Sequence, residues 1–122
     1  MAETTGQALG RYGEDVAALH LRAAGMQVLS RNWRCREGEL DLVAREADGT
    51  LVFVEVKTRS GSGYGAPSEA VDRRKSAKVR QVACRWLVEH RPAGAGDLRF
   101  DVVSIVRRPG WAPVVTHLRG AF

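Results

Sequence analysis

The chain has 122 residues, of which 44% are hydrophobic and 27% charged, and its net charge is +5. This composition is ordinary for a folded domain, so we expect a single domain over residues 1–122 and exclude a disordered or fibrous chain. There is no apolar run that could cross a bilayer, no secretory signal pattern and no cysteine pair with metal-site or disulfide spacing, which together predict a cytoplasmic protein without membrane association.

Hydrophobic periodicity indicates the secondary structure. Residues 6–24 have helical spacing that stops at Gly25, and residues 27–36, 39–45 and 51–58 have the composition of strands. A second helix is expected over 69–90 with Ser68 as its N-cap, then a buried strand over 98–106 and a last strand over 112–118. This order, αβββαβ with an extra strand, predicts an α/β fold with a mixed sheet flanked by helices.

Charged residues in the second and third strands are the most informative feature. A tight loop that ends with Gly49 in the left-handed conformation would place Asp41 opposite Glu55 and Glu39 opposite Lys57. All four side chains would then share one face of the sheet, whereas a slip of one residue would move Asp41 to the other face. Buried charges need partners, a metal or a catalytic role. This cluster therefore predicts a site for a divalent metal and a phosphate.

The positive charge is concentrated after these strands. The basic residues of this segment are Arg73, Arg74, Lys75, Lys78, Arg80, Arg85 and Arg91. A basic helix face is often only a solvated surface, but its place directly after a metal site favours phosphate binding, with Arg59, Arg73 and Lys75 as the best candidates. Nothing resembles a recognition helix or zinc finger, so binding is expected to be non-specific or selective for nucleic-acid structure.

The glycine-rich loop over 60–67 is expected beside this site. Its small residues suit a segment that orders on nucleic acid. Tyr64 either stacks on a base or sugar or packs against its own sheet.

The order of elements and the ExD…ExK pattern resemble the PD-(D/E)xK restriction-endonuclease-like superfamily, which includes Holliday-junction resolvases. More closely, the chain resembles the YraN-type family of small bacterial endonuclease-like proteins. The segments that carry the resemblance are GRYGEDVAALHL (10–21), NWRCREGELDLVA (32–44), VFVEVKTR (52–59), AVDRRK (70–75) and RFDVV (99–103). They cover nearly the whole chain, and in combination they are specific. One departure is Leu40, which stands where the superfamily name has a Pro before the Asp.

This resemblance implies an endonuclease that depends on Mg²⁺ or Mn²⁺ and hydrolyses DNA, with branched or damaged DNA as substrate by analogy with resolvases and repair nucleases. Asp41, Glu55 and the Val56 carbonyl would hold the metal. Lys57 would orient the attacking water or stabilise charge on the phosphorus oxygens, and Glu14 would supply a helix carboxylate. A homodimer would place two such sites on two strands.

Each assignment has an alternative. Glu55 and Lys57 could form a structural ion pair, Glu14 could be a solvated first-turn acid that suits the helix dipole, and Glu39 could support the site or pair with Lys57. For the whole protein, the alternatives are a nucleic-acid-binding module with little or no catalysis of its own, and an adaptor that acts through a partner.

The remaining residues with chemical potential are expected to be structural. Asp101 should bond the backbone near a strand end, and Gly10 and Gly13 should mark close packing of helix on sheet. The histidines His20, His90 and His117 are interpreted as single residues that form no ligand pair. The tryptophans Trp33, Trp86 and Trp111 are interpreted as core or edge anchors rather than as base-stacking platforms.

Overall fold

The computed structural model describes residues 3–61 and 73–122. The elements are α1 (Thr5–Ala23), β1 (Gln27–Cys35), β2 (Gly38–Arg45), β3 (Leu51–Ser60), α2 (Arg73–His90), β4 (Leu98–Arg107) and β5 (Val114–Leu118). They confirm the predicted α/β class and the αβββαβ order with its extra strand. The expected start of the second helix at residues 69–72, its cap Ser68 and the loop residue Tyr64 lie outside the described residues. Within the described ranges, no helix is long and apolar enough to span a membrane.

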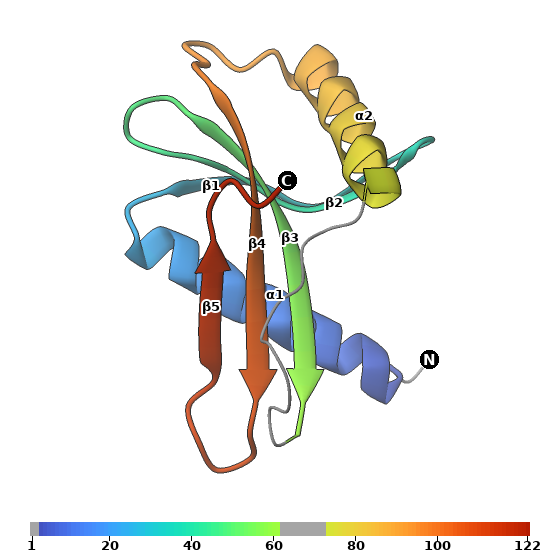
Figure 1. Cartoon of the computed structure of the whole chain (residues 1–122), viewed down its shortest axis with the longest axis vertical. Coiled ribbons are helices and arrows are strands. Elements are labelled where there is room, and N and C mark those ends of the chain that lie inside the picture. Colours follow the sequence, from blue (N-terminus) through green and yellow to red (C-terminus); the bar gives the residue numbers. More distant parts are fainter. Residues whose placement is uncertain (1–2, 62–72) are drawn as a thin grey trace.

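The five strands form one sheet in the order β1-β2-β3-β4-β5. Neighbouring strands are antiparallel except β3 and β4, which run parallel because α2 forms the crossover between them. Helix α1 crosses one face of the sheet diagonally, while α2 lies near the β1–β2 ribbon on the other face (Figure 1).

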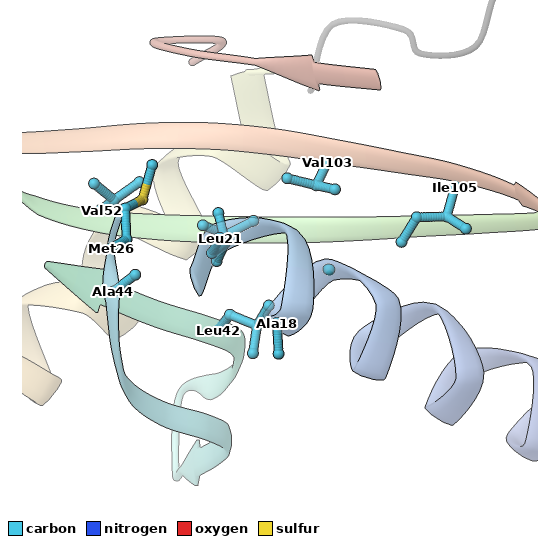
Figure 2. Packing of buried hydrophobic residues seen from close by; sticks show 10 residues of the cluster. Ala18, Leu21, Met26, Leu42, Ala44, Val52, Val103 and Ile105 are labelled. Atoms are coloured by element: carbon cyan, nitrogen blue, oxygen red, sulfur yellow. The ribbon is translucent and has the colours of Figure 1, made fainter. Parts of the chain in front are cut away.

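Two hydrophobic clusters cover the two faces of the sheet. The α1 cluster includes Leu21, Leu42 and Ile105 (Figure 2), and the α2 cluster includes Phe53 and Trp86. Successive residues of β3 alternate between the clusters, since residues 52 and 54 join the first and residues 51 and 53 join the second. This alternation decides the face from which each charged side chain of β3 emerges.

Helix α1 lies unusually close to β3 at one point. A Cβ atom on Gly13 would lie 1.8 Å from Thr58 Oγ1 and 2.8 Å from Thr58 Cβ, so only glycine permits this approach. The predicted close packing is therefore confirmed at Gly13. It is wrong at Gly10, where an added Cβ would have nothing within 4 Å.

The hairpin that joins β2 to β3 has the predicted turn. Gly49 has a φ of 95°, the Gly49 N–H donates to the Glu46 carbonyl at 2.9 Å, and the Glu46 N–H donates to the Thr50 carbonyl at 2.9 Å. The ladder that follows pairs Arg45 with Leu51. The loop and its glycine set this register, as expected.

Candidate metal and nucleic-acid site

Strands β2 and β3 separate at a point that we call the fork, defined by Asp41 on β2 and by Glu55 and Val56 on β3. Their ladder has its last pair at Leu42 and Val54. The preceding residues of β2, 38–41, pair with β1 only. If this register continued by one residue, Asp41 would lie opposite Glu55, as predicted. However, the Asp41 carboxylate replaces a backbone acceptor, and its Oδ2 accepts a hydrogen bond from the Val56 N–H at 2.8 Å.

The expectation that four charged side chains share one face holds only in part: Glu39, Asp41 and Glu55 line the same cavity on the α2 side, but Glu39 and Asp41 are not confined to that side. Glu55 and Lys57 leave β3 on the α2 side, following Phe53. Asp41 and Glu39 instead line cavities on both sides of the sheet, because the open strand edge at the fork connects them. The cavity on the α1 side has a volume of about 830 Å³ and is lined by residues that include Glu14, Asn32, Asp41, Val56 and Thr58. The cavity on the α2 side has a volume of about 310 Å³ and is lined by residues that include Glu55, Lys75 and Lys78.

The pKa of Asp41 is raised from its ordinary value to about 6. Burial is the main cause, and the negative charges of Glu55, Glu39 and Glu14 act in the same direction. The hydrogen bond from the Val56 N–H opposes these effects but does not cancel them. The ionised Asp41 is therefore a carboxylate whose surroundings lack sufficient positive charge.

Glu55 is paired with a basic residue of α2. Lys75 Nζ lies 2.5 Å from Glu55 Oε1, and the Glu55 side chain is 17% exposed. The structural ion pair considered from the sequence, between Glu55 and Lys57, is thus replaced by one with Lys75. Within the part of the chain that the structure describes, the half-buried Lys57 forms no hydrogen bond or ion pair. Lys75 was predicted to bind phosphate, but in this structure its charge compensates that of Glu55, a predicted metal ligand.

Glu14 is neither in the first turn of its helix nor solvated, so that interpretation is wrong. Helix α1 begins at Thr5, and Glu14 is only 8% exposed. Its Oε1 accepts hydrogen bonds from Arg31 Nε at 3.2 Å, Arg31 Nη2 at 3.1 Å and Asn32 Nδ2 at 2.9 Å. The close approach of the preceding Gly13 to β3 places this carboxylate on the α1 side of the fork.

Sequence reasoning did not single out Arg31 and Asn32, although they hold Glu14. Asn32 has a φ of 49°, in the left-handed region, and asparagine tolerates this region better than most residues. In the sequence, an asparagine within a predicted strand was the feature that could have indicated an irregular backbone at this position.

The other predicted residues lie around the fork. Glu39 forms an ion pair at 3.2 Å with Arg34, its neighbour across the β1–β2 ladder, and not with Lys57. Arg59 lies at the exposed end of β3, and Arg73 is the exposed first residue of α2. Among the residues 3–61 and 73–122, no three acidic, histidine or cysteine side chains are gathered closely enough to form a complete metal cage.

A second polar cluster, which we call the Asp101 network, lies on β4, the neighbour of β3 on the side away from β2. Asp101 is fully buried and accepts hydrogen bonds from Arg99 Nε at 2.9 Å, His117 Nε2 at 2.8 Å and the Gly120 N–H at 2.9 Å. Burial opposes its ionisation, but these bonds outweigh it and lower the Asp101 pKa to about 2. This confirms the structural role expected for Asp101.

The same network corrects the interpretation of the histidines as isolated residues. His20 Nε2 lies 3.0 Å from His117 Nδ1, and burial, together with His117 and Arg119, lowers the His20 pKa. The two residues come from α1 and β5 and are 97 positions apart. No local pattern could have paired them.

Comparison with known proteins shows the family to which the chain belongs. Residues 13–105 match the family described as "Uncharacterised protein family UPF0102". The chain belongs to this family. A UPF0102 protein of Frankia casuarinae is 60% identical over 116 residues, which cover 94% of this chain and 96% of the relative. A UPF0102 protein of Frankia alni is 58% identical over the full length of both chains, and one of Nocardia farcinica is 53% identical over 95% of this chain and 90% of the relative. The matched residues include Glu14 and the whole fork.

Proposed function

We propose that this UPF0102 protein is a metal-dependent nuclease that hydrolyses phosphodiester bonds in DNA. The observation that carries the proposal is the state of Asp41, a partly buried carboxylate with a raised pKa beside three other acids. A carboxylate that only stabilised the fold would be matched by cations or donors, because an uncompensated buried charge is destabilising. Asp41 instead lies at an open strand edge between two cavities.

Asp41, Glu55 and the Val56 carbonyl would hold Mg²⁺ or Mn²⁺ at the fork. The donor set fits, since hard divalent cations prefer oxygen ligands and usually bind through one or two carboxylates. The raised pKa of Asp41 supports this fit, because a cation would supply the missing positive charge. When bound, the ion would make a water acidic enough to attack and would neutralise charge on the phosphate.

The chain's own residues would position and stabilise the reacting phosphate. Lys57 emerges on the same side of β3 as Glu55, and its compact ammonium group suits the charge that develops on the phosphorus oxygens. Lys75 would leave Glu55 to the metal and contact a phosphate instead. Arg59 and Arg73, exposed on neighbouring elements, would add phosphate contacts that are independent of sequence.

The resemblance to the YraN-type family and the PD-(D/E)xK superfamily supports this proposal. The αβββαβ order and the mixed sheet agree with that fold. Leu40, which stands where the superfamily name has a Pro, is 4% exposed and belongs to the α2 cluster. Its burial gives this position a packing role that does not require a proline. The analogy with resolvases extends to branched or damaged DNA as substrate and to a homodimer with two sites.

A nucleic-acid-binding module without catalysis is the second candidate. The observation that favours it is the ion pair between Lys75 and Glu55, which balances one of the two proposed metal ligands. In such a module Glu55 would stay paired with Lys75, and the exposed cations alone would contact phosphates.

Metal binding separates these candidates. Calorimetry should detect Mn²⁺ binding to the wild-type protein and no binding to Asp41→Asn or Glu55→Gln. Glu89→Gln is the matched control, since it removes one exposed carboxylate at the far end of α2 and should leave binding unchanged. Binding that persists in both fork variants would eliminate the proposed site.

Cleavage then tests the chemistry. The purified protein is incubated with branched, nicked, single-stranded and duplex DNA in Mg²⁺ or Mn²⁺. Lys57→Ala should abolish cleavage while most Mn²⁺ and DNA affinity remains, because the lysine acts on the transition state. Lys57→Arg should not restore it, since a planar guanidinium is a poor substitute for a compact ammonium. A wild-type protein that binds DNA but cuts none of these substrates would establish the binding module instead.

A further inference from the structure

The hairpin between β4 and β5, residues 107–114, carries an exposed tryptophan. Trp111 is 75% exposed, whereas Trp86 is 1% exposed in the α2 cluster. The prediction that Trp111 is a core or edge anchor is therefore wrong. A large aromatic residue held in solvent contributes little to the core and is available to a partner.

The backbone of this hairpin holds the indole in a defined position. The Trp111 N–H donates to the Arg108 carbonyl at 3.0 Å, and Gly110 has a φ of 80°. With Pro109 at the second position, these are the features of a type II turn. Because proline and the turn hydrogen bond restrict the loop before any ligand arrives, a ligand would pay little entropy for ordering it.

Two arginines of the hairpin lie against aromatic rings, one of them the indole. The Arg108 guanidinium carbon lies 5.9 Å from the centre of the Trp111 ring, and that of Arg107 lies 5.1 Å from the centre of the Tyr12 ring. Both arginines are exposed, and the chain contains no acidic residue after Asp101. The hairpin therefore presents an aromatic ring and cations with no acidic residue of its own, a combination that suits bases and phosphates.

The hairpin lies at the end of the strand that carries Glu55 and Lys57. Arg107 pairs with Ser60 in the parallel ladder, and its carbonyl accepts a hydrogen bond from the Gly61 N–H at 3.1 Å. Figure 1 shows the hairpin beyond the ends of β3 and β4. At about 3.3 Å per residue, Ser60 is roughly 17 Å from Glu55 along β3, so the hairpin begins well beyond the fork.

We infer that this hairpin is a base-stacking platform, on which Trp111 takes an unpaired base while Arg107 and Arg108 contact the adjoining phosphates. The inference deepens the proposed function and rests on it for the identity of the cleaved bond. It assigns the substrate to nucleic acids with an unpaired nucleotide away from the cleaved bond, since the hairpin begins where β3 ends beyond the fork. A lipid surface is less suited, since apart from one indole the turn offers mainly charged and small residues for insertion.

Binding is measured without metal, so that the result does not depend on cleavage. Labelled oligo(dT) in EDTA should bind the wild-type protein and quench its exposed tryptophan fluorescence. Trp111→Ala should weaken binding about ten-fold, the effect of losing one stacked base, and Trp111→Phe should restore most of it. Equal affinity for wild type and Trp111→Ala, with both variants shown to be folded by circular dichroism, would overturn the inference.

A charge-matched pair of double variants tests the arginines. Arg107→Ala with Arg108→Ala should reduce the slope of log affinity against log salt by about 1.4, the value expected for two contacts to a single strand. Arg22→Ala with Arg36→Ala removes the same charge from exposed positions near the C-terminal end of α1 and in the turn between β1 and β2, and should leave the slope nearly unchanged. Equal slopes in both pairs would contradict the phosphate contacts. Fluorescence changes with anionic phospholipid vesicles but none with oligo(dT) would assign the hairpin to a lipid surface.

Failure of this inference and failure of the proposed function give different results. If oligo(dT) binding depends on Trp111 but no DNA is cut in Mn²⁺, the platform stands and the nuclease fails. If DNA is cut but the rate and the affinity are unchanged in Trp111→Ala, the nuclease stands and the platform fails.

Discussion

Two aspartates on opposite sides of β3 have opposite electrostatic states. Asp41 bonds the Val56 N–H on the β2 side and has a pKa raised to about 6, whereas Asp101 pairs with Val54 on the β4 side and has a pKa lowered to about 2. Burial acts in the same direction on both carboxyl groups, since it disfavours the charged form. The difference therefore comes from their partners.

Asp101 is surrounded by donors, and Asp41 by acids. Arg99, His117 and the Gly120 N–H compensate the negative charge of Asp101. Asp41 has one backbone donor and three neighbouring carboxylates. A buried acid whose charge is matched by the protein stabilises the fold, while one that is left unmatched needs a proton or a cation from solution. The comparison separates an aspartate whose charge the protein compensates from one whose charge it does not, without reference to any relative.

The largest expected effect is on the Asp101 network. Asp101→Ala should reduce the free energy of unfolding by about 3–5 kcal/mol, because it leaves the half-buried Arg99 and the buried His117 without their shared acceptor. Urea unfolding at pH 7 measures this loss, with Glu89→Gln as the exposed control. A loss below about 1 kcal/mol would show that the network does not stabilise the fold.

The next effect concerns the packing that brings Glu14 to the fork. Gly13→Ala should reduce stability by about 1–3 kcal/mol, since the added Cβ overlaps Thr58. It should also weaken Mn²⁺ binding by displacing α1 from β3. Gly10→Ala is the matched control, because its Cβ meets open space and should stabilise the helix by up to about 1 kcal/mol. Similar losses from both alanines would mean that helix propensity, and not the contact with Thr58, decides the result.

Asp41→Asn should change stability in the opposite direction from the Asp101 variant. The asparagine keeps an acceptor for the Val56 N–H and removes the charge that the neighbouring acids oppose. We expect a gain of about 1–2 kcal/mol at pH 7, less than the full shift in pKa implies because solvent screens the fork. Thermal unfolding in EDTA measures it. A loss of stability would indicate that Asp41 is a structural acid like Asp101.

The smallest effect is a change of these differences with pH. The Asp41 pKa is raised by folding, so the gain in Asp41→Asn should be complete above pH 6 and should shrink by about 1 kcal/mol as the pH falls towards 4. The Asp101 pKa is lowered, so the loss in Asp101→Ala should be complete above about pH 4 and should shrink as the pH falls towards 2. Unfolding at pH 7, 5 and 3 tests both windows. Differences that do not change with pH would show that neither effect is electrostatic.

The hairpin of β2 and β3 shows how far local pattern can reach. Its period, its apolar residues and Gly49 were sufficient to predict the turn, the register and the face shared by Glu55 and Lys57. Local geometry did not predict that residues 38–41 of β2 pair with β1 alone and that the ladder with β3 begins only at Leu42, because this depends on the pairing of β2 with β1. The edge position of Asp41 therefore emerged only from the sheet.

Other sites depended on contacts between distant segments. Lys75 was identified as a cation near the site, but its pairing with Glu55 required α2 to be placed against the sheet. His20 and His117 have no local relation, and their contact follows from the packing of α1 and β5 on one sheet.

The sequence by itself determined the elements of this protein, because hydrophobic periodicity and turn residues act over a few positions. It also determined the membership of Asp41, Glu55 and Lys57 in one hairpin, since neighbours along strands stay neighbours in the fold. Tertiary structure alone decided which charges are compensated. The exposure of Trp111, the burial of Glu14 and the opposite states of Asp41 and Asp101 are examples. Desolvation depends on burial and Coulomb interactions depend on the distance between charges, and both are set only when the chain folds.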